Sequence, residues 1–203
     1  MIDLYLWRTP NGYKPLIFAE EAAIEYRLHP VNISKGQQFE PAFLEISPNN
    51  KIPALVDGSL SIFESGAILL YLAQKYQRFM PSETSAYYEV MQWLMWQIGG
   101  LGPMMGQAGH FKNAAPSDVP YAKERYFNES HRLLSVLEKQ LTQREFIAEE
   151  YSIADIAIFP WVYAANGSYL DIDLGRYPNT KAWMDAIAAR PAVIKSYEIG
   201  AGL

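Results

Sequence analysis

The sequence predicts a two-part fold, with an α/β domain over residues 1–78 followed by an all-helical bundle domain over residues 85–203. Two observations carry this prediction. Short apolar runs alternate with helical stretches up to residue 78, in the order β-α-β-α-β-β-α. After residue 80 no convincing strand pattern follows, and apolar residues recur at helical spacing instead.

The elements of the first domain follow from local composition. They are predicted as strands at residues 2–7, 26–33, 54–56 and 60–63, and as helices at residues 14–24, 39–46 and 66–76. The first strand carries large apolar side chains on both faces, which is typical of a buried strand. Asp57-Gly58 between the last two strands is the strongest hairpin signal in the chain. Helices that separate short strands indicate a mixed sheet with helices on its faces, which is the thioredoxin-like arrangement.

The second domain is predicted from its helical periodicity. The segment 91–98 is apolar on nearly all sides, so it must be buried, and a second subunit is one candidate for covering it. The glycines and proline of segment 99–103 should kink or interrupt this helix. Ser82 or Thr84 is expected to cap its start. Ser152 and Asp155 have the spacing of a capping box, with Asp in the usual Glu position.

Composition excludes several classes of function. The 17 basic and 22 acidic side chains give a net charge of −5, and no basic cluster suggests nucleic acid or lipid as a partner. The absence of cysteine excludes disulfides, thiolate metal ligands and a cysteine nucleophile. The three histidines show no metal-ligand spacing, so we expect no metal. No apolar run approaches the roughly 20 residues of a membrane helix, and the acidic start predicts no secretory signal; we expect a cytoplasmic protein.

Pro53 stands directly before a predicted strand. Proline cannot donate a ladder hydrogen bond, so an ordinary trans proline that ends a loop explains its position. The alternative is a cis Ile52-Pro53 bond, which turns the backbone of residue 52 outward. The N–H and C=O groups of Ile52 then pair with an extended peptide in β fashion.

Glu64 and Ser65 lie at the junction between a predicted strand and a predicted helix. Ser65 is a good N-cap, and an acidic residue suits the positive end of the helix dipole, so capping alone explains both residues. The functional alternative is that Ser65 and the helix N-terminus hold a ligand carboxylate while Glu64 holds an ammonium group.

The segment Thr9-Pro10-Asn11-Gly12 joins the first strand to the first helix. These are ordinary turn residues. Ligands of open sheets bind outside the carboxyl ends of strands, however, so Thr9 and Asn11 are placed to donate hydrogen bonds to a ligand sulfur.

Arg125 and Arg132 stand seven residues apart, on one face of a long predicted helix. This face is either a solvated basic surface, or Arg125 contacts a ligand carboxylate from it.

These motifs together resemble the glutathione transferase superfamily over nearly the whole chain. Segments 47–55 and 63–72 resemble its glutathione-binding half, and segments 151–157 and 190–193 resemble its helical half. Segments 9–12, 92–97, 99–104 and 120–126 are similar, more narrowly, to the bacterial nu-class disulfide-bond reductases, which have no catalytic cysteine. The loop between Asp57 and Leu60 is shorter than is usual in that subgroup, which leaves the substrate preference open.

The resemblance implies a role for each site residue. Thr9 and Asn11 match the residues beside the glutathione sulfur. The groups that hold the glycyl and cysteinyl parts correspond to Gln38, Lys51 and Ile52, next to the predicted cis Pro53. Glu64 and Ser65 match the γ-glutamyl contacts, and Arg125 matches an arginine of a partner subunit.

The function implied is that of a homodimeric, glutathione-dependent disulfide-bond reductase. It would bind glutathione or glutathione disulfide together with a small disulfide substrate, and a bound glutathione thiolate would carry out thiol–disulfide exchange. Two alternatives remain open. One is conjugation of glutathione to an electrophile by the same thiolate, and the other is a non-catalytic binding module that keeps the fold.

Overall fold

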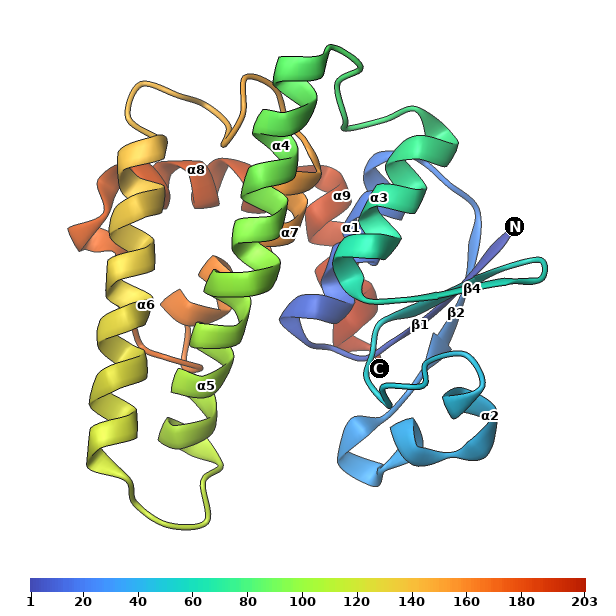
Figure 1. The fold of residues 1–203 in the computed structure, drawn as a ribbon, viewed down its shortest axis with the longest axis horizontal. Helices are drawn as coiled ribbons and strands as arrows, with labels where there is room; N and C mark the ends of the chain where they lie inside the picture. Colours follow the sequence, from blue (N-terminus) through green and yellow to red (C-terminus); the bar gives the residue numbers. More distant parts are fainter. The chain divides into compact units, whose positions relative to one another are not determined.

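The computed structural model describes all residues 1–203 and divides the chain into two compact units (Figure 1). The first unit comprises residues 1–80 together with residues 188–203, and the second comprises residues 81–187. The predicted fold class is confirmed: a thioredoxin-like sheet with helices is followed in the chain by a helical domain.

A four-stranded mixed sheet forms the centre of the first unit. Its strands are β1 (Ile2–Leu6), β2 (Tyr26–Pro30), β3 (Ala54–Asp57) and β4 (Leu60–Phe63). They lie in the order β2-β1-β3-β4. Strand β1 is parallel to β2 and antiparallel to β3, and β3 and β4 form the hairpin predicted at Asp57-Gly58.

Helices cover both faces of this sheet. Helices α1 (Pro10–Glu21) and α3 (Ser65–Tyr76) pack on one face, against the buried alternate residues of β1, of which Leu4 is fully buried. On the other face, Tyr5 packs with Phe43 of the short helix α2 (Pro41–Leu44). The 3₁₀ turns η1 (Ile33–Lys35) and η2 (Gln37–Phe39) lead into α2.

The start of α1 and the end of β2 differ from the prediction because local caps override composition. Helix α1 begins at Pro10, not at residue 14, since the Thr9 hydroxyl accepts the Gly12 N–H at 3.1 Å and caps the helix. Strand β2 ends at Pro30, not at residue 33, since the Asn32 side chain accepts two backbone N–H groups and starts a turn. The Thr9–Gly12 segment is therefore the first turn of a helix.

The C-terminal helix α9 (Pro191–Ala201) packs along α1 in the first unit (Figure 1). At one end Arg190 donates two hydrogen bonds to Glu21, at 2.5 and 2.9 Å. Next to this pair, Lys195 lies 2.7 Å from Glu20. These contacts hold the helix that carries Thr9, Asn11 and Gly12 against a second helix.

The second unit is entirely helical. Its elements are α4 (Thr84–Trp96), the π-helical turn η3 (Gln97–Leu101), α5 (Gly102–Asn113), α6 (Pro120–Gln140), α7 (Ile153–Asn166), the 3₁₀ turn η4 (Leu174–Arg176) and α8 (Pro178–Ala188). Helix α5 packs along α6, and α4 along α7 (Figure 1). The predicted interruption at segment 99–103 takes the form of the π turn, which joins α4 to α5 without ending the helix. None of the helices is long and apolar enough to span a bilayer.

The caps of this unit confirm one expectation and correct another. The capping box is present: Ser152 Oγ accepts the Ala154 N–H, and the Asp155 carboxylate accepts the Ser152 N–H. The cap of α4, however, is neither Ser82 nor Thr84. Glu83 takes this position, because its longer carboxylate accepts the N–H groups of two residues of the first helical turn, at 3.0 and 2.9 Å.

Candidate functional site

A small pocket opens in the first unit beside the start of α3. It encloses about 50 Å³, which accommodates an end group of a ligand but not a whole tripeptide. Its lining residues are Asn11, Ser47, Lys51, Ile52, Pro53, Phe63, Glu64 and Ser65. Six of the nine predicted site residues therefore meet in one place, although they come from three separate stretches of sequence.

The loop before β3 forms one wall of this pocket. The Ile52-Pro53 peptide bond is cis, as predicted. Pro53 is buried, Ile52 is half-buried and Lys51 is exposed. The fully buried Ser47, which sequence reasoning missed, donates its hydroxyl to the Lys51 carbonyl at 2.8 Å and so fixes the loop that presents residues 51–53.

Glu64 and Ser65 form the opposite wall, in a different arrangement from the one expected. Glu64, not Ser65, occupies the N-cap position of α3, and its side chain makes no capping hydrogen bond. Its φ is 71° and its ψ 116°, a backbone conformation that L-residues rarely adopt. The exposed carboxylate is thus left available at the pocket, and such strained backbone is characteristic of ligand-binding sites.

Ser65 begins the helix and is buried, with 5% of its surface exposed. Its hydroxyl accepts a hydrogen bond from Lys14 Nζ at 3.1 Å. Lys14 lies on α1 and is fully buried, and this burial lowers its pKa to about 7 although the nearby Glu64 carboxylate acts in the opposite direction. No sequence signal pointed to Lys14, because a lysine in an amphipathic helix is usually exposed.

The strand-to-helix junction supplies Asn11 to the pocket lining, whereas Thr9 is not part of that lining. The Thr9 Oγ1 atom accepts the Gly12 N–H as the cap of α1, which leaves its hydroxyl proton for another acceptor. Gly12 is required here, because a Cβ atom at this position would lie 2.1 Å from the Trp7 carbonyl oxygen.

Gln38 lies outside the pocket lining, on the 3₁₀ turn η2. Its Oε1 atom is buried and has no hydrogen-bond partner in the structure. A buried acceptor without a donor is unfavourable by about 1–3 kcal/mol. The ligand contact that the resemblance implies for Gln38 stays a prediction, since this acceptor is enclosed by protein and lies outside the pocket lining.

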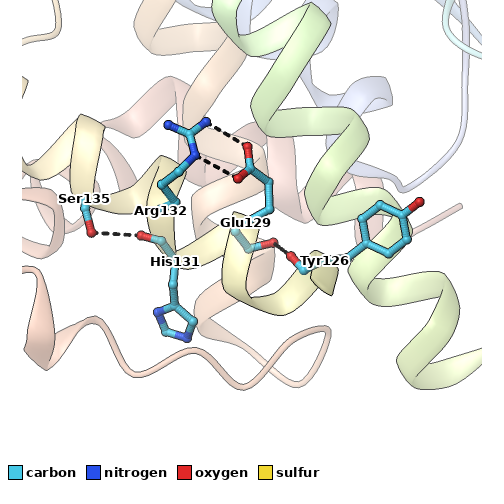
Figure 2. A network of polar contacts seen from close by, with 6 residues as sticks. Tyr126, Glu129, His131, Arg132 and Ser135 are labelled. Carbon is cyan, nitrogen blue, oxygen red and sulfur yellow. Dashed lines mark hydrogen bonds and ion pairs between the residues drawn. The ribbon is translucent and has the colours of Figure 1, made fainter. Parts of the chain in front are cut away.

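Arg125 belongs to the second unit and lines a different, larger pocket of about 610 Å³ between α5 and α6. The residues around it are Met104, Tyr121, Glu124, Arg125, Tyr126, Asn128, Glu129 and Arg132. Figure 2 shows that the Arg132 guanidinium is held by Glu129 of the same helix, with hydrogen bonds of 2.8 and 2.7 Å. Arg125 and Arg132 line the same pocket from one face of α6, and Arg132 is the one that forms an ion pair with Glu129.

The chemistry available in the small pocket is that of polar recognition. It offers a carboxylate at Glu64, a hydroxyl at Ser65, an amide at Asn11 and the backbone of Ile52. No group of three or more histidine, aspartate or glutamate side chains is arranged to hold a metal ion. A zwitterionic, extended peptide suits this set of groups, and any sulfur chemistry must use a sulfur of the ligand because the chain has no cysteine.

Family models match both parts of the chain. Residues 1–74 match the N-terminal domain of glutathione S-transferase, and residues 120–186 match its C-terminal domain. The disulfide-bond oxidoreductase YfcG of Escherichia coli (strain K12) is 54% identical over 200 residues, which cover 95% of this chain and 92% of that protein.

Solved structures are similar over nearly the whole chain as well. A glutathione transferase family member from Pseudomonas fluorescens pf-5, crystallised with two glutathione molecules bound, superposes with a TM-score of 0.92 at 45% identity, covering 96% of this chain and 91% of that one. A glutathione transferase from Pseudomonas putida with one glutathione disulfide bound per subunit gives a TM-score of 0.93 at 42% identity, with 96% and 90% coverage.

Proposed function

Since this chain belongs to the glutathione transferase family, we propose that it reduces disulfide bonds with bound glutathione as the source of the thiol. The observation that carries this proposal is the pocket that gathers Asn11, Ile52, Glu64 and Ser65 in a protein without any cysteine. The name of the E. coli relative YfcG, a disulfide-bond oxidoreductase, supports the same reaction class.

Each wall of the pocket suits one part of glutathione. The γ-glutamyl end carries an ammonium and a carboxylate on the same carbon. We assign Glu64, which lines the pocket, to the ammonium, and Ser65 with the N-terminus of α3 to the carboxylate. The backbone of Ile52 pairs with the cysteinyl part, and Lys51 and Gln38 contact the glycyl end. Arg125 is proposed to contact a glutathione carboxylate from the partner subunit of a homodimer.

The sulfur then lies near the start of α1. We assign Asn11 and Thr9 as donors to the thiolate, because Asn11 lines the pocket on the first turn of this helix and the cap hydrogen bond of Thr9 does not use its hydroxyl proton. Hydrogen bonds to the charged form favour it, so the thiol pKa should fall below its usual value of about 8.5.

The reaction takes place in two exchange steps. The bound glutathione thiolate attacks one sulfur of the substrate disulfide, forms a mixed disulfide and releases the other sulfur as a thiolate. A second glutathione thiolate attacks the glutathione sulfur of this mixed disulfide. Glutathione disulfide forms, and the second substrate sulfur leaves as a thiolate. Two glutathiones are oxidised for each disulfide reduced, and the enzyme contributes orientation and thiolate stabilisation.

The test compares two substrate classes. The purified protein with excess glutathione should reduce a small disulfide such as hydroxyethyl disulfide, with glutathione disulfide as the product, faster than it conjugates a chloro-aromatic electrophile. Pretreatment with a thiol alkylator, removed before the assay, should leave the rate unchanged. Faster conjugation would make the protein a conjugating transferase. If calorimetry detects no glutathione binding, the fold serves another ligand and the proposal is abandoned. The homodimer and the cytoplasmic location stay predictions, the first testable by sedimentation.

A further inference from the structure

Lys14 is a buried charged residue beside the pocket that has no role in the proposed chemistry. It is fully buried on α1, and its ammonium lies 3.1 Å from the Ser65 hydroxyl oxygen, on the protein side of the pocket wall. A buried lysine is unfavourable unless something compensates its charge. Lys14 contacts a residue of the pocket lining from behind, so its charge lies close to any ligand that Ser65 holds.

The direction of the hydrogen bond gives Lys14 a defined effect on Ser65. An ammonium group has three donors and no acceptor, so the Ser65 oxygen must accept from Lys14. The hydroxyl proton of Ser65 is then left to donate elsewhere. A hydroxyl held as a donor recognises an anion such as a carboxylate, and the buried positive charge behind it strengthens that preference.

The other charges packed around α1 are engaged with one another. Glu20 pairs with Lys195 of α9, and Glu21 pairs with Arg190, the N-cap residue of α9. Asp3 of β1 pairs with Arg27 and His29 of β2. On α3, Lys75 pairs with Asp57. Glu64 is the carboxylate that favours the charged form of Lys14, against the effect of burial.

We propose that Lys14 is a positioning residue for the γ-glutamyl carboxylate of glutathione: its ammonium fixes the Ser65 hydroxyl as a donor and supplies the buried positive charge that the carboxylate requires. This inference rests on the proposed function, since it deepens the recognition of the same ligand. It predicts that replacing Lys14 weakens the binding of the γ-glutamyl carboxylate and leaves the binding of the rest of the ligand unchanged. Because burial lowers the pKa of Lys14 to about 7, a bound carboxylate should draw a proton onto it near neutral pH.

The test uses calorimetric titration with two matched ligands. One is S-methylglutathione, in which the thiol no longer titrates. The other is the same molecule without the γ-glutamyl carboxylate, S-methyl-(4-aminobutyryl)cysteinylglycine. Lys14→Met should bind the first about ten- to a hundredfold more weakly than the parent, and the second within about twofold of the parent. Lys14→Arg should recover part of the loss, and Lys75→Met, on the same unit but away from the pocket, should change neither ligand's affinity.

A purely structural role would weaken both ligands equally in Lys14→Met, and that result overturns the inference. If the variant does not fold, proton uptake by the unmodified protein on ligand binding tests the inference instead. Titrations at about pH 7.5 in buffers of different ionisation enthalpy should show proton uptake with S-methylglutathione and less without the carboxylate; equal uptake overturns the inference. Failure of the unmodified protein to bind S-methylglutathione at all would instead count against the proposed function.

Discussion

At Glu64, the effect of a substitution on glutathione binding can be separated from its effect on stability, because the backbone at this position is strained. Its φ of 71° in a non-glycine residue stores strain of roughly 1–3 kcal/mol. Its side chain is exposed and makes no capping hydrogen bond, so little packing is lost when it is removed. Glycine tolerates positive φ but loses roughly 0.5–1 kcal/mol through the greater freedom of the unfolded chain. The strain relieved should exceed this entropic loss, so Glu64→Gly should stabilise the protein by about 1 kcal/mol.

Glutathione affinity should move in the opposite direction. Loss of the carboxylate leaves the γ-glutamyl ammonium without its partner, which weakens binding by about 2 kcal/mol, or roughly thirtyfold. Glu64→Ala is the matched control, because it removes the same carboxylate while it keeps the strain. Both variants should therefore show the same loss of affinity in calorimetry, and only the glycine variant should melt higher than the parent, by about 2–4 °C. A glycine variant that melts no higher than the alanine variant would refute the strain argument, and unchanged affinity in both would move the γ-glutamyl site elsewhere.

Three further predictions concern the sulfur, the junction and the second unit. Thr9→Val combined with Asn11→Ala should greatly reduce disulfide-reductase turnover with only a modest change in glutathione affinity, whereas turnover within about twofold of the parent would exclude both residues from thiolate stabilisation. Gly12→Ala should destabilise the protein by about 2 kcal/mol or more in urea unfolding, because its Cβ would lie 2.1 Å from the Trp7 carbonyl oxygen. Asp155 is buried and its pKa is raised to about 6, mainly by desolvation, so the folded state binds its proton more tightly than the unfolded state does. Its contribution to stability should therefore fall by about 2 kcal/mol as the pH rises from 4 to 6, and the difference in unfolding free energy between parent and Asp155→Asn should follow that titration.

Local sequence signals predicted most of the elements. The hairpin at Asp57-Gly58 and the capping box at Ser152 and Asp155 each depend on residues close together in the chain, and both are present. The misplaced boundaries fall where two local interactions compete. At Thr9 a single cap hydrogen bond extends α1 back to Pro10, and at Glu83 a carboxylate reaches two backbone N–H groups that a serine or threonine was expected to satisfy.

The sequence by itself also determined where the candidate site would be, because Asn11, Ile52, Glu64 and Ser65 stand at strand ends and at a helix start, positions that a mixed sheet places along one edge. Only the tertiary structure decided how these groups are supported. Lys14 and Ser65 are 51 residues apart, and the burial of a lysine depends on which helix packs over it, not on its neighbours in the chain. Ser47 became part of the wall because the loop folds back on Lys51. Long-range packing sets burial, and burial sets the charge and the donor direction of these groups, so the recognition chemistry of the pocket was fixed only once the chain had folded.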